Sequence, residues 1–149
     1  MENETTNNTN ERTITSIRLF NTTTDQMLDA WTNAKKLAKW WGPKGFSNTF
    51  HEFNPVPGGD WKFTMHGPTG ADYPNESVFV EVGPGRIILN HVNAPIFKLT
   101  ATFEPLGNQT KLIFEQEFET ADLFEKVKHI CIPANEENFD RLEVVLGLR

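Results

Sequence analysis

Apolar and polar residues alternate in several stretches of the second half of the chain, with the period of two that is typical of strands. Trp61, Phe63 and Met65, for example, alternate with polar neighbours. The same alternation recurs in SVFVEV (77–82), RIILNHV (86–92), FKLTATFE (97–104) and KLIFEQEF (111–118). Because side chains at every second position share one face of a strand, these stretches predict a sheet with one apolar face. PLGNQ (105–109) predicts a hairpin turn between the last two.

Helical spacing precedes this sheet region. TITSIRLF (13–20) predicts a first strand, and Thr23 and Gln26 then stand in capping-box spacing directly before an apolar stripe. The pattern predicts a helix of about three turns. A short second helix is expected over residues 34–41, and Gly42-Pro43 must end it.

The last stretch, residues 121–148, returns to helical spacing with a proline inside it. Pro133 is expected to interrupt the helix, and Asn135 is expected to cap the part that follows. That part has one apolar stripe, formed by Phe139, Leu142, Val145 and Leu146. Gly147 can end the helix.

The order of these elements predicts an α+β fold: a strand, two helices, about six strands joined by short turns, and a C-terminal helix. Consecutive strands with short connections are expected to form an antiparallel meander, and the final helix can cover one of its faces. That face carries many large aromatic residues, whereas the helix offers one narrow stripe. We therefore expect incomplete filling, and hence a cavity between sheet and helix.

Length, charge and cysteine content narrow the class of protein. The 149 residues suit one domain, which we place at residues 12–149, after a polar tail at 1–11 that is expected to be disordered. The formal charge of −6 argues against nucleic acid as a partner. The N-terminus lacks a signal-peptide pattern, and no run of about 18 apolar residues predicts a membrane span. Cys131 is the only cysteine, which suits a reducing compartment, so we expect a cytoplasmic protein.

Four segments together resemble a known superfamily. They are TTTDQMLDAWTNAKKLAKWWGPKGF (22–46), PGGDWKFTMHGPTGADYPN (57–75), EVGPGRIIL (81–89) and FDRLEVVL (139–146). They are similar to the SRPBCC (START-like, birch-pollen-allergen-like) superfamily, and look most like its homologues of the activator of the ninety-kilodalton heat-shock-protein ATPase. The resemblance implies a helix-grip fold: a curved antiparallel sheet of about seven strands wraps around a long C-terminal helix, and two short helices follow the first strand.

The resemblance leaves three functions open, because a fold alone does not decide between them. Members typically hold an apolar ligand between the sheet and the long helix, so the leading hypothesis is a protein that binds a small hydrophobic, lipid-like or aromatic molecule. The first alternative is a co-chaperone-like interaction module with a chaperone partner and a filled interior. The second is a polyketide cyclase or dehydratase in which His91 acts as acid or base.

Candidate ligand-binding residues follow from the inward phase of the strands. Trp40 and Trp41 cannot share a helix face; Trp41, in phase with Leu37, is expected to be the buried anchor, and Trp40 to reach the cavity. His91 and Gln116 are in phase with apolar residues, so each is expected either to bond to backbone or water, or to orient the polar end of a ligand. The full set is Trp40, Trp61, Phe63, Met65, Val80, His91, Leu99, Phe114 and Gln116.

No catalytic residue, metal site or cofactor is assigned from the sequence. Catalysis needs a nucleophile with its base, a carboxylate pair or a metal cluster, and none is visible as a local motif. Pairing Phe53 with Trp61 sets His51 opposite Phe63 and His66 opposite Asn48, so the two imidazoles are not expected to share a metal. Whether the protein is an enzyme stays open.

Overall fold

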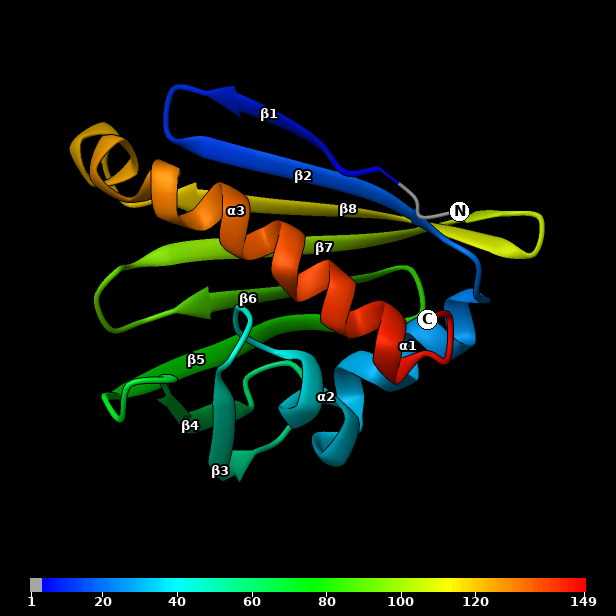
Figure 1. The fold of residues 1–149 in the computed structure, drawn as a ribbon, viewed down its shortest axis with the longest axis horizontal. Coiled ribbons are helices and arrows are strands. Elements are labelled where there is room, and N and C mark those ends of the chain that lie inside the picture. Colours follow the sequence, from blue (N-terminus) through cyan, green and yellow to red (C-terminus); the bar gives the residue numbers. More distant parts are fainter. Residues whose placement is uncertain (1–3) are drawn as a thin grey trace.

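The computed structural model describes residues 4–149, and residues 1–3 of the expected tail lie outside that part. Within it, eight antiparallel strands form one curved sheet in the order β1-β2-β8-β7-β6-β5-β4-β3 (Figure 1). The strands are β1 (Thr6–Asn10), β2 (Thr13–Phe20), β3 (Ser47–Phe53), β4 (Asp60–His66), β5 (Asp72–Gly83), β6 (Arg86–His91), β7 (Phe97–Leu106) and β8 (Gln109–Phe118). Strands β3 to β8 form the expected meander, and β2 pairs with β8. The predicted α+β helix-grip fold is confirmed, with one strand more than expected.

The additional strand is β1, where a disordered tail was predicted. Residues 6–10 pair antiparallel with β2 at the edge of the sheet, so this part of the prediction is wrong. Pairing at a sheet edge is made by backbone N–H and C=O groups, so a segment with polar side chains can form it as well as one with apolar side chains. Two side-chain bonds add to it: Ser16 Oγ donates to Asn7 Oδ1 at 2.6 Å, and Arg18 Nε donates to Thr5 Oγ1 at 2.7 Å.

Two β-bulges change which side chains face inward. In the β3–β4 pair, Phe53 lies opposite Trp61 as predicted, but the register shifts between Phe50 and Glu52, so Phe50 rather than His51 faces Phe63. The β5–β6 pair shifts between residues 79 and 81 in the same way. A bulge adds one residue to one strand and reverses the alternation beyond it.

Two short helices, α1 (Thr24–Thr32) and α2 (Ala34–Trp40), follow β2. The capping box predicted at Thr23 and Gln26 is present at the start of α1. Asn33 separates the helices and caps the second, because its Oδ1 accepts the backbone N–H groups of Lys35 and Lys36. In Figure 1 both helices lie at the C-terminal end of α3 (Ala121–Val145).

The long helix α3 is continuous, so the predicted interruption at Pro133 and the cap at Asn135 are wrong. Pro133 cannot donate to the carbonyl of His129, but both residues are exposed, and water can hydrate that carbonyl. The cap lies at Thr120, whose Oγ1 accepts the N–H of Leu123 at 3.1 Å. The predicted end at Gly147 is confirmed: this residue has φ of 78°, and the N–H of Leu148 returns to the carbonyl of Glu143.

The C-terminal half of α3 is fixed to the sheet by ion pairs around a buried arginine. Arg18 on β2 is 1% exposed and projects inward beside Ile14, Ser16 and Phe20. Its guanidinium donates to Glu136 Oε1 at 2.7 Å, to Asp140 Oδ1 at 2.9 Å and to Glu143 Oε1 at 2.9 Å. These carboxylates recur along the helix at spacings of four and three residues, so they share one face. Figure 1 shows α3 running diagonally across this face of the sheet.

No helix in residues 4–149 is long and apolar enough to cross a membrane.

We predict that Arg18→Met lowers the free energy of unfolding by about 3 kcal/mol, because it removes a buried cation from Glu143, the one buried carboxylate of the three. The loss is expected at the low end for a buried pair, since Glu136 and Asp140 are partly exposed and Arg149 still contacts Glu143 at 2.9 Å. Arg12→Met is the matched control: Arg12 lies just before the same strand, and its contacts with Glu117 at 4.0 Å and with the carbonyl of Glu119 at 3.1 Å are at the surface. Its loss is expected to stay below about 1 kcal/mol. Urea unfolding measures both variants, and equal losses would show that the ion pairs of Arg18 are not what fixes α3.

Candidate functional site

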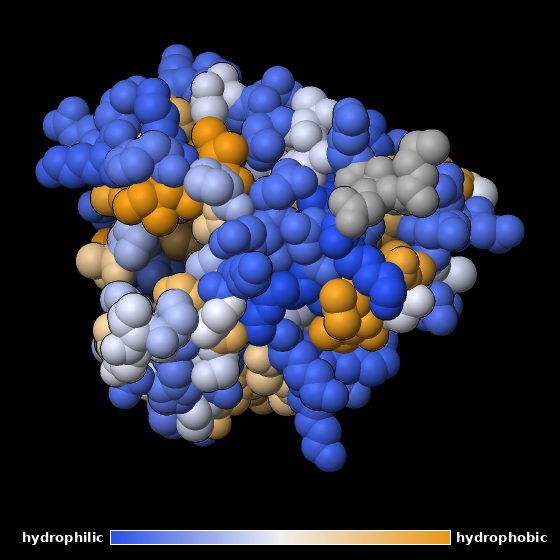
Figure 2. All heavy atoms as spheres, in the orientation of Figure 1, coloured by the Kyte–Doolittle hydropathy of each residue, from blue (hydrophilic) through white to orange (hydrophobic). Residues whose placement is uncertain are grey.

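A cavity of about 450 Å³ lies between the sheet, the middle of α3 and the turn that follows α2. Figure 2 shows the molecule hollowed beside the N-terminal half of α3, with hydrophobic side chains bordering the hollow. This half of the helix is buried less than the rest: between Phe124 and Asn135 no residue of α3 is fully buried. The cavity therefore lies where the helix is not fixed closely to the sheet.

Most of the cavity wall is apolar. It is formed by side chains from the sheet and from the turn, chiefly Trp41, Phe63, Met65, Leu89, Phe97 and Phe114. Other rings hold these rings in place: Phe63 stacks on Trp61 with centroids 4.3 Å apart, and Trp41 meets Trp61 edge to face at 5.1 Å. Such packing restricts the rotamers of the wall, so the cavity is largely pre-formed.

The turn that brings Trp41 to the cavity depends on a glycine and on two side chains of α3. Gly42 has φ of 99°, and a Cβ there would lie 2.8 Å from Met65 Cε. Its N–H donates to Asn138 Oδ1 at 2.7 Å. Arg141 donates to the carbonyls of Gly42 at 2.7 Å and Pro43 at 3.1 Å. These bonds connect the turn to the fixed half of α3.

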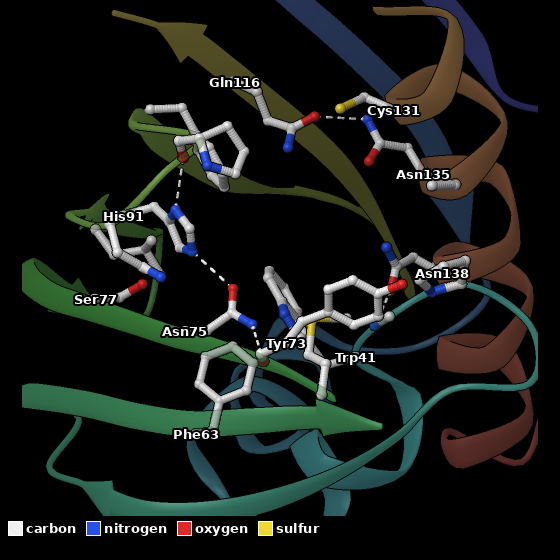
Figure 3. Close-up of a pocket in the computed structure, with 18 of the residues that line it drawn as sticks. Trp41, Phe63, Tyr73, Asn75, Ser77, His91, Gln116, Cys131, Asn135 and Asn138 are labelled. Atoms are coloured by element: carbon white, nitrogen blue, oxygen red, sulfur yellow. Dashed lines mark hydrogen bonds between the residues drawn. The ribbon is translucent and has the colours of Figure 1, made fainter. Parts of the chain in front are cut away.

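Three carboxamides form the polar side of the cavity, next to the helix. Figure 3 shows Gln116 of β8 joined to Asn135 of α3, with Asn138 nearby on the same helix. Asn135 Nδ2 donates to Gln116 Oε1 at 2.9 Å and to Ser16 Oγ at 3.2 Å. All three residues line the cavity and are more than nine-tenths buried.

His91 lies on the opposite side of the cavity, and the protein engages both of its ring nitrogens. Nδ1 lies 2.7 Å from the carbonyl oxygen of Pro95, and Nε2 lies 2.7 Å from Asn75 Oδ1 (Figure 3). The ring also stacks on Phe97, with centroids 4.7 Å apart. Burial lowers the pKa of His91, and hydrogen bonds to the backbone of Pro95 and Asn93 offset this only in part. The imidazole is thus held as part of the wall.

Cys131 is the one thiol in the wall. Burial raises its pKa to about 11, so the sulfur is protonated at neutral pH and is a poor nucleophile. Among the described residues that line the cavity there is no lysine, arginine, aspartate or glutamate. The wall therefore carries no formal charge at neutral pH, apart from any proton taken up by His91.

Five of the nine residues predicted to bind a ligand line this cavity: Phe63, Met65, His91, Phe114 and Gln116. They come from strands β4, β6 and β8, which the meander places side by side. The alternation of apolar and polar residues predicted correctly which side chains of these strands face inward. Whether these residues bind a ligand stays a prediction.

The other four predicted residues do not line the cavity. Trp61 and Leu99 point inward as expected, but both are fully buried in the core. Val80 is 48% exposed, because the bulge on β5 makes it the extra residue and leaves Phe79 in the buried position opposite Leu89.

The roles predicted for Trp40 and Trp41 are reversed. Trp40 is the buried anchor, and its Nε1 donates to the carbonyl of Ala30 at 2.9 Å. Trp41 caps α2 with an extended backbone, φ −70° and ψ 130°, so the helical phase that linked it to Leu37 no longer applies. Its ring turns to the cavity instead.

Asn135 and Asn138 are the polar residues that the sequence analysis missed. They stand in the same helical phase as the buried Phe139 and Leu142, which was the available signal. The expected interruption at Pro133 concealed it. Elsewhere in the described part of the chain, no three His, Cys, Asp or Glu side chains come together as a metal site would require.

The fold is similar to that of several solved structures. A solution NMR structure of a protein from Arthrobacter aurescens matches with a TM-score of 0.89 and 19% identity, over 97% of this chain and 92% of that one. A crystal structure of a protein from Rhodobacter sphaeroides matches with a TM-score of 0.86 and 21% identity, over 99% of this chain and 100% of that one. The crystal structure of the AHSA1 protein from Silicibacter pomeroyi matches with a TM-score of 0.73 and 17% identity, over 91% of this chain and 98% of that one. At these identities the likeness shows the fold alone.

No curated protein matches the chain. A family model described as "Activator of Hsp90 ATPase homolog 1-like protein" matches residues 21–147. This match spans most of the chain and confirms the resemblance seen in its motifs. The chain belongs to the family of Activator of Hsp90 ATPase homolog 1-like proteins.

Proposed function

We propose that this protein binds a small hydrophobic molecule, aromatic or lipid-like, in the cavity between the sheet and α3. The observation that carries the proposal is the cavity itself: its volume of about 450 Å³ is in the range of small-molecule sites, and its wall is mostly apolar with a few polar groups. The aromatic rings of Trp41, Phe63, Phe97 and Phe114 offer flat faces on which a planar ligand can stack.

The interaction-module alternative is less well supported. A protein that acts only through its outer surface gains nothing from an apolar hollow that reaches into its core, because the side chains of that hollow stay in contact with water. The family description mentions an activator of a chaperone ATPase, and a chaperone partner is the natural candidate for such a module. No surface of the described residues singles out that partner, so ligand binding is preferred.

The enzyme alternative would require His91 to exchange a proton with a substrate. Each ring nitrogen lies 2.7 Å from a protein oxygen, and a neutral ring can donate to only one of them, so a substrate would have to displace Pro95 or Asn75 from the ring. This favours a positioning role for His91 over an acid or base role. A cytoplasmic location is part of the proposal, and the single cysteine supports it.

Filling the cavity is expected to block binding. We predict that the uncharged fluorescent probe N-phenyl-1-naphthylamine binds the wild-type protein saturably, with one site per chain. Ala134→Trp places an indole in the cavity and is expected to weaken binding at least about tenfold, since the probe and the indole need the same space. Ala121→Trp is the matched control, an exposed position on the same helix. Probe fluorescence measures binding. Equal affinity for all three proteins, or no saturation with the wild type, would contradict the proposal.

The buried state of His91 predicts a pH dependence of stability. Unfolding returns the ring to water, where its pKa is near 6.5, whereas burial holds the folded-state pKa lower. The unfolded chain therefore takes up the proton first. The stabilising contribution is complete above about pH 6.5 and is lost as the pH falls toward the lower folded-state pKa.

Urea unfolding between pH 7.5 and 5 measures this loss. His91→Gln is expected to flatten the stability profile in that window. His129→Gln removes an exposed histidine on α3 and is expected to show the same dependence of stability on pH as the wild type. A His91→Gln profile as steep as the wild type would show that His91 is not held neutral by burial.

A further inference from the structure

The three carboxamides beside the cavity have hydrogen-bonding groups that the protein leaves without partners. Gln116, Asn135 and Asn138 are 7%, 3% and 8% exposed, so water reaches them only through the cavity. Their unpaired groups are open to the cavity, where water can hydrate them, so a ligand that displaces this water must replace its hydrogen bonds. An unpaired group in the wall of an apolar cavity indicates where the polar part of a ligand would lie.

The orientation of each amide follows from its fixed neighbours. The N–H of Gly42 can only donate, so Asn138 presents its oxygen to the turn and its NH₂ group remains. Ser16 gives its only hydroxyl proton to Asn7, so it must accept from Asn135 Nδ2. Asn135 Nδ2 then donates its second hydrogen to Gln116 Oε1.

Three groups are left over. Within the described residues, no protein atom is bonded to Gln116 Nε2, Asn138 Nδ2 or Asn135 Oδ1. The first two are donors and the third is an acceptor. Figure 3 shows the three residues on one side of the cavity, across from His91. The cavity thus offers amide N–H donors and one amide oxygen on its helix side, facing an aromatic wall.

The absence of charge in the wall restricts the ligand further. A carboxylate or an ammonium group in this place would lose its hydration without meeting an opposite charge, and that loss is large. An uncharged carbonyl compound loses little, because the carbonyl oxygen accepts from the free amide N–H groups. An N–H or hydroxyl on the same ligand has an acceptor in Asn135 Oδ1.

We propose that the ligand is an uncharged aromatic carbonyl compound that also carries an N–H or O–H group, such as a carboxamide, a lactam or a phenolic ketone. Its carbonyl oxygen accepts from Gln116 and Asn138, its donor bonds to Asn135, and its ring lies against Phe63 and Phe114. This inference rests on the proposed function and adds the chemical class of the ligand.

Three naphthalenes with the same body test the class: 2-naphthamide, 2-naphthoate and 2-methylnaphthalene, each displacing N-phenyl-1-naphthylamine at pH 7.5. The amide is expected to bind about tenfold more tightly than either of the others, which corresponds to the net value of a good hydrogen bond. Equal affinities, or preference for the naphthoate, overturn the inference but leave the proposed function intact. If none of the three displaces the probe, the inference is overturned, whereas the proposed function is overturned only if the probe itself does not bind saturably.

A variant separates hydrogen bonding from shape. Gln116→Met keeps the length of the side chain but removes its N–H donors, so it is expected to reduce the amide preference to about two- to threefold. The preference is measured as the ratio of the affinities for 2-naphthamide and 2-methylnaphthalene within each variant, so a general change in the cavity wall cancels. Gln109→Met, on the same strand but outside the cavity, is the control and keeps the full preference. A full preference for the amide in Gln116→Met would overturn the inference. If that variant does not fold, Gln116→Asn takes its place: it moves the donor back by one methylene and is likewise expected to reduce the amide preference.

Discussion

The buried contact of Arg18 with the carboxylates of α3 decides how the helix lies on the sheet. It fixes the C-terminal half of α3 to β2 through bonds of 2.7 to 2.9 Å, and the aromatic core packs beneath that half. The start of α3 packs on the sheet through apolar contacts, with Phe124 buried against Ile14 and Phe118. The cavity lies between these two contacts, beside the middle of the helix. Asn138 connects the two regions, because its oxygen holds Gly42 in the turn while its NH₂ group faces the cavity. The stability of the fold and the shape of the cavity therefore depend on the same helix face.

Local patterns predicted most of the fold. The alternation of the strands, the capping box at Thr23 and the glycine end at Gly147 each depend on residues close together in sequence, and each is confirmed. Strand β1 could not be predicted from composition, because edge pairing with β2 orders a polar segment that buries almost nothing. The continuity of α3 through Pro133 depends on solvent access to one carbonyl, which requires knowing the side of the helix that is exposed.

The candidate site was predicted less completely, for three physical reasons. A bulge reverses the phase of a strand without leaving a local signal, and it moved Val80 to the outside. Trp41 is the C-cap of α2 and has an extended backbone, so helical phase does not determine where its ring points. The roles of Trp40 and Trp41 were therefore predicted the wrong way round. Asn135 was read as a helix start, although its phase with the apolar stripe places it in the interior. Inward-facing residues on regular strands, such as Phe63 and Gln116, were found because strand phase alone determines them.

The central claim is that the cavity between the sheet and the middle of α3 binds a hydrophobic molecule. Amide chemical shifts of ¹⁵N-labelled protein, recorded as N-phenyl-1-naphthylamine is added, test it most directly because they report where the probe lies. The account predicts saturable shift changes centred on Phe63, Gln116 and Asn135, with β1 and the β7–β8 turn unchanged. Changes spread over the outer surface, with those three amides unmoved, would contradict it.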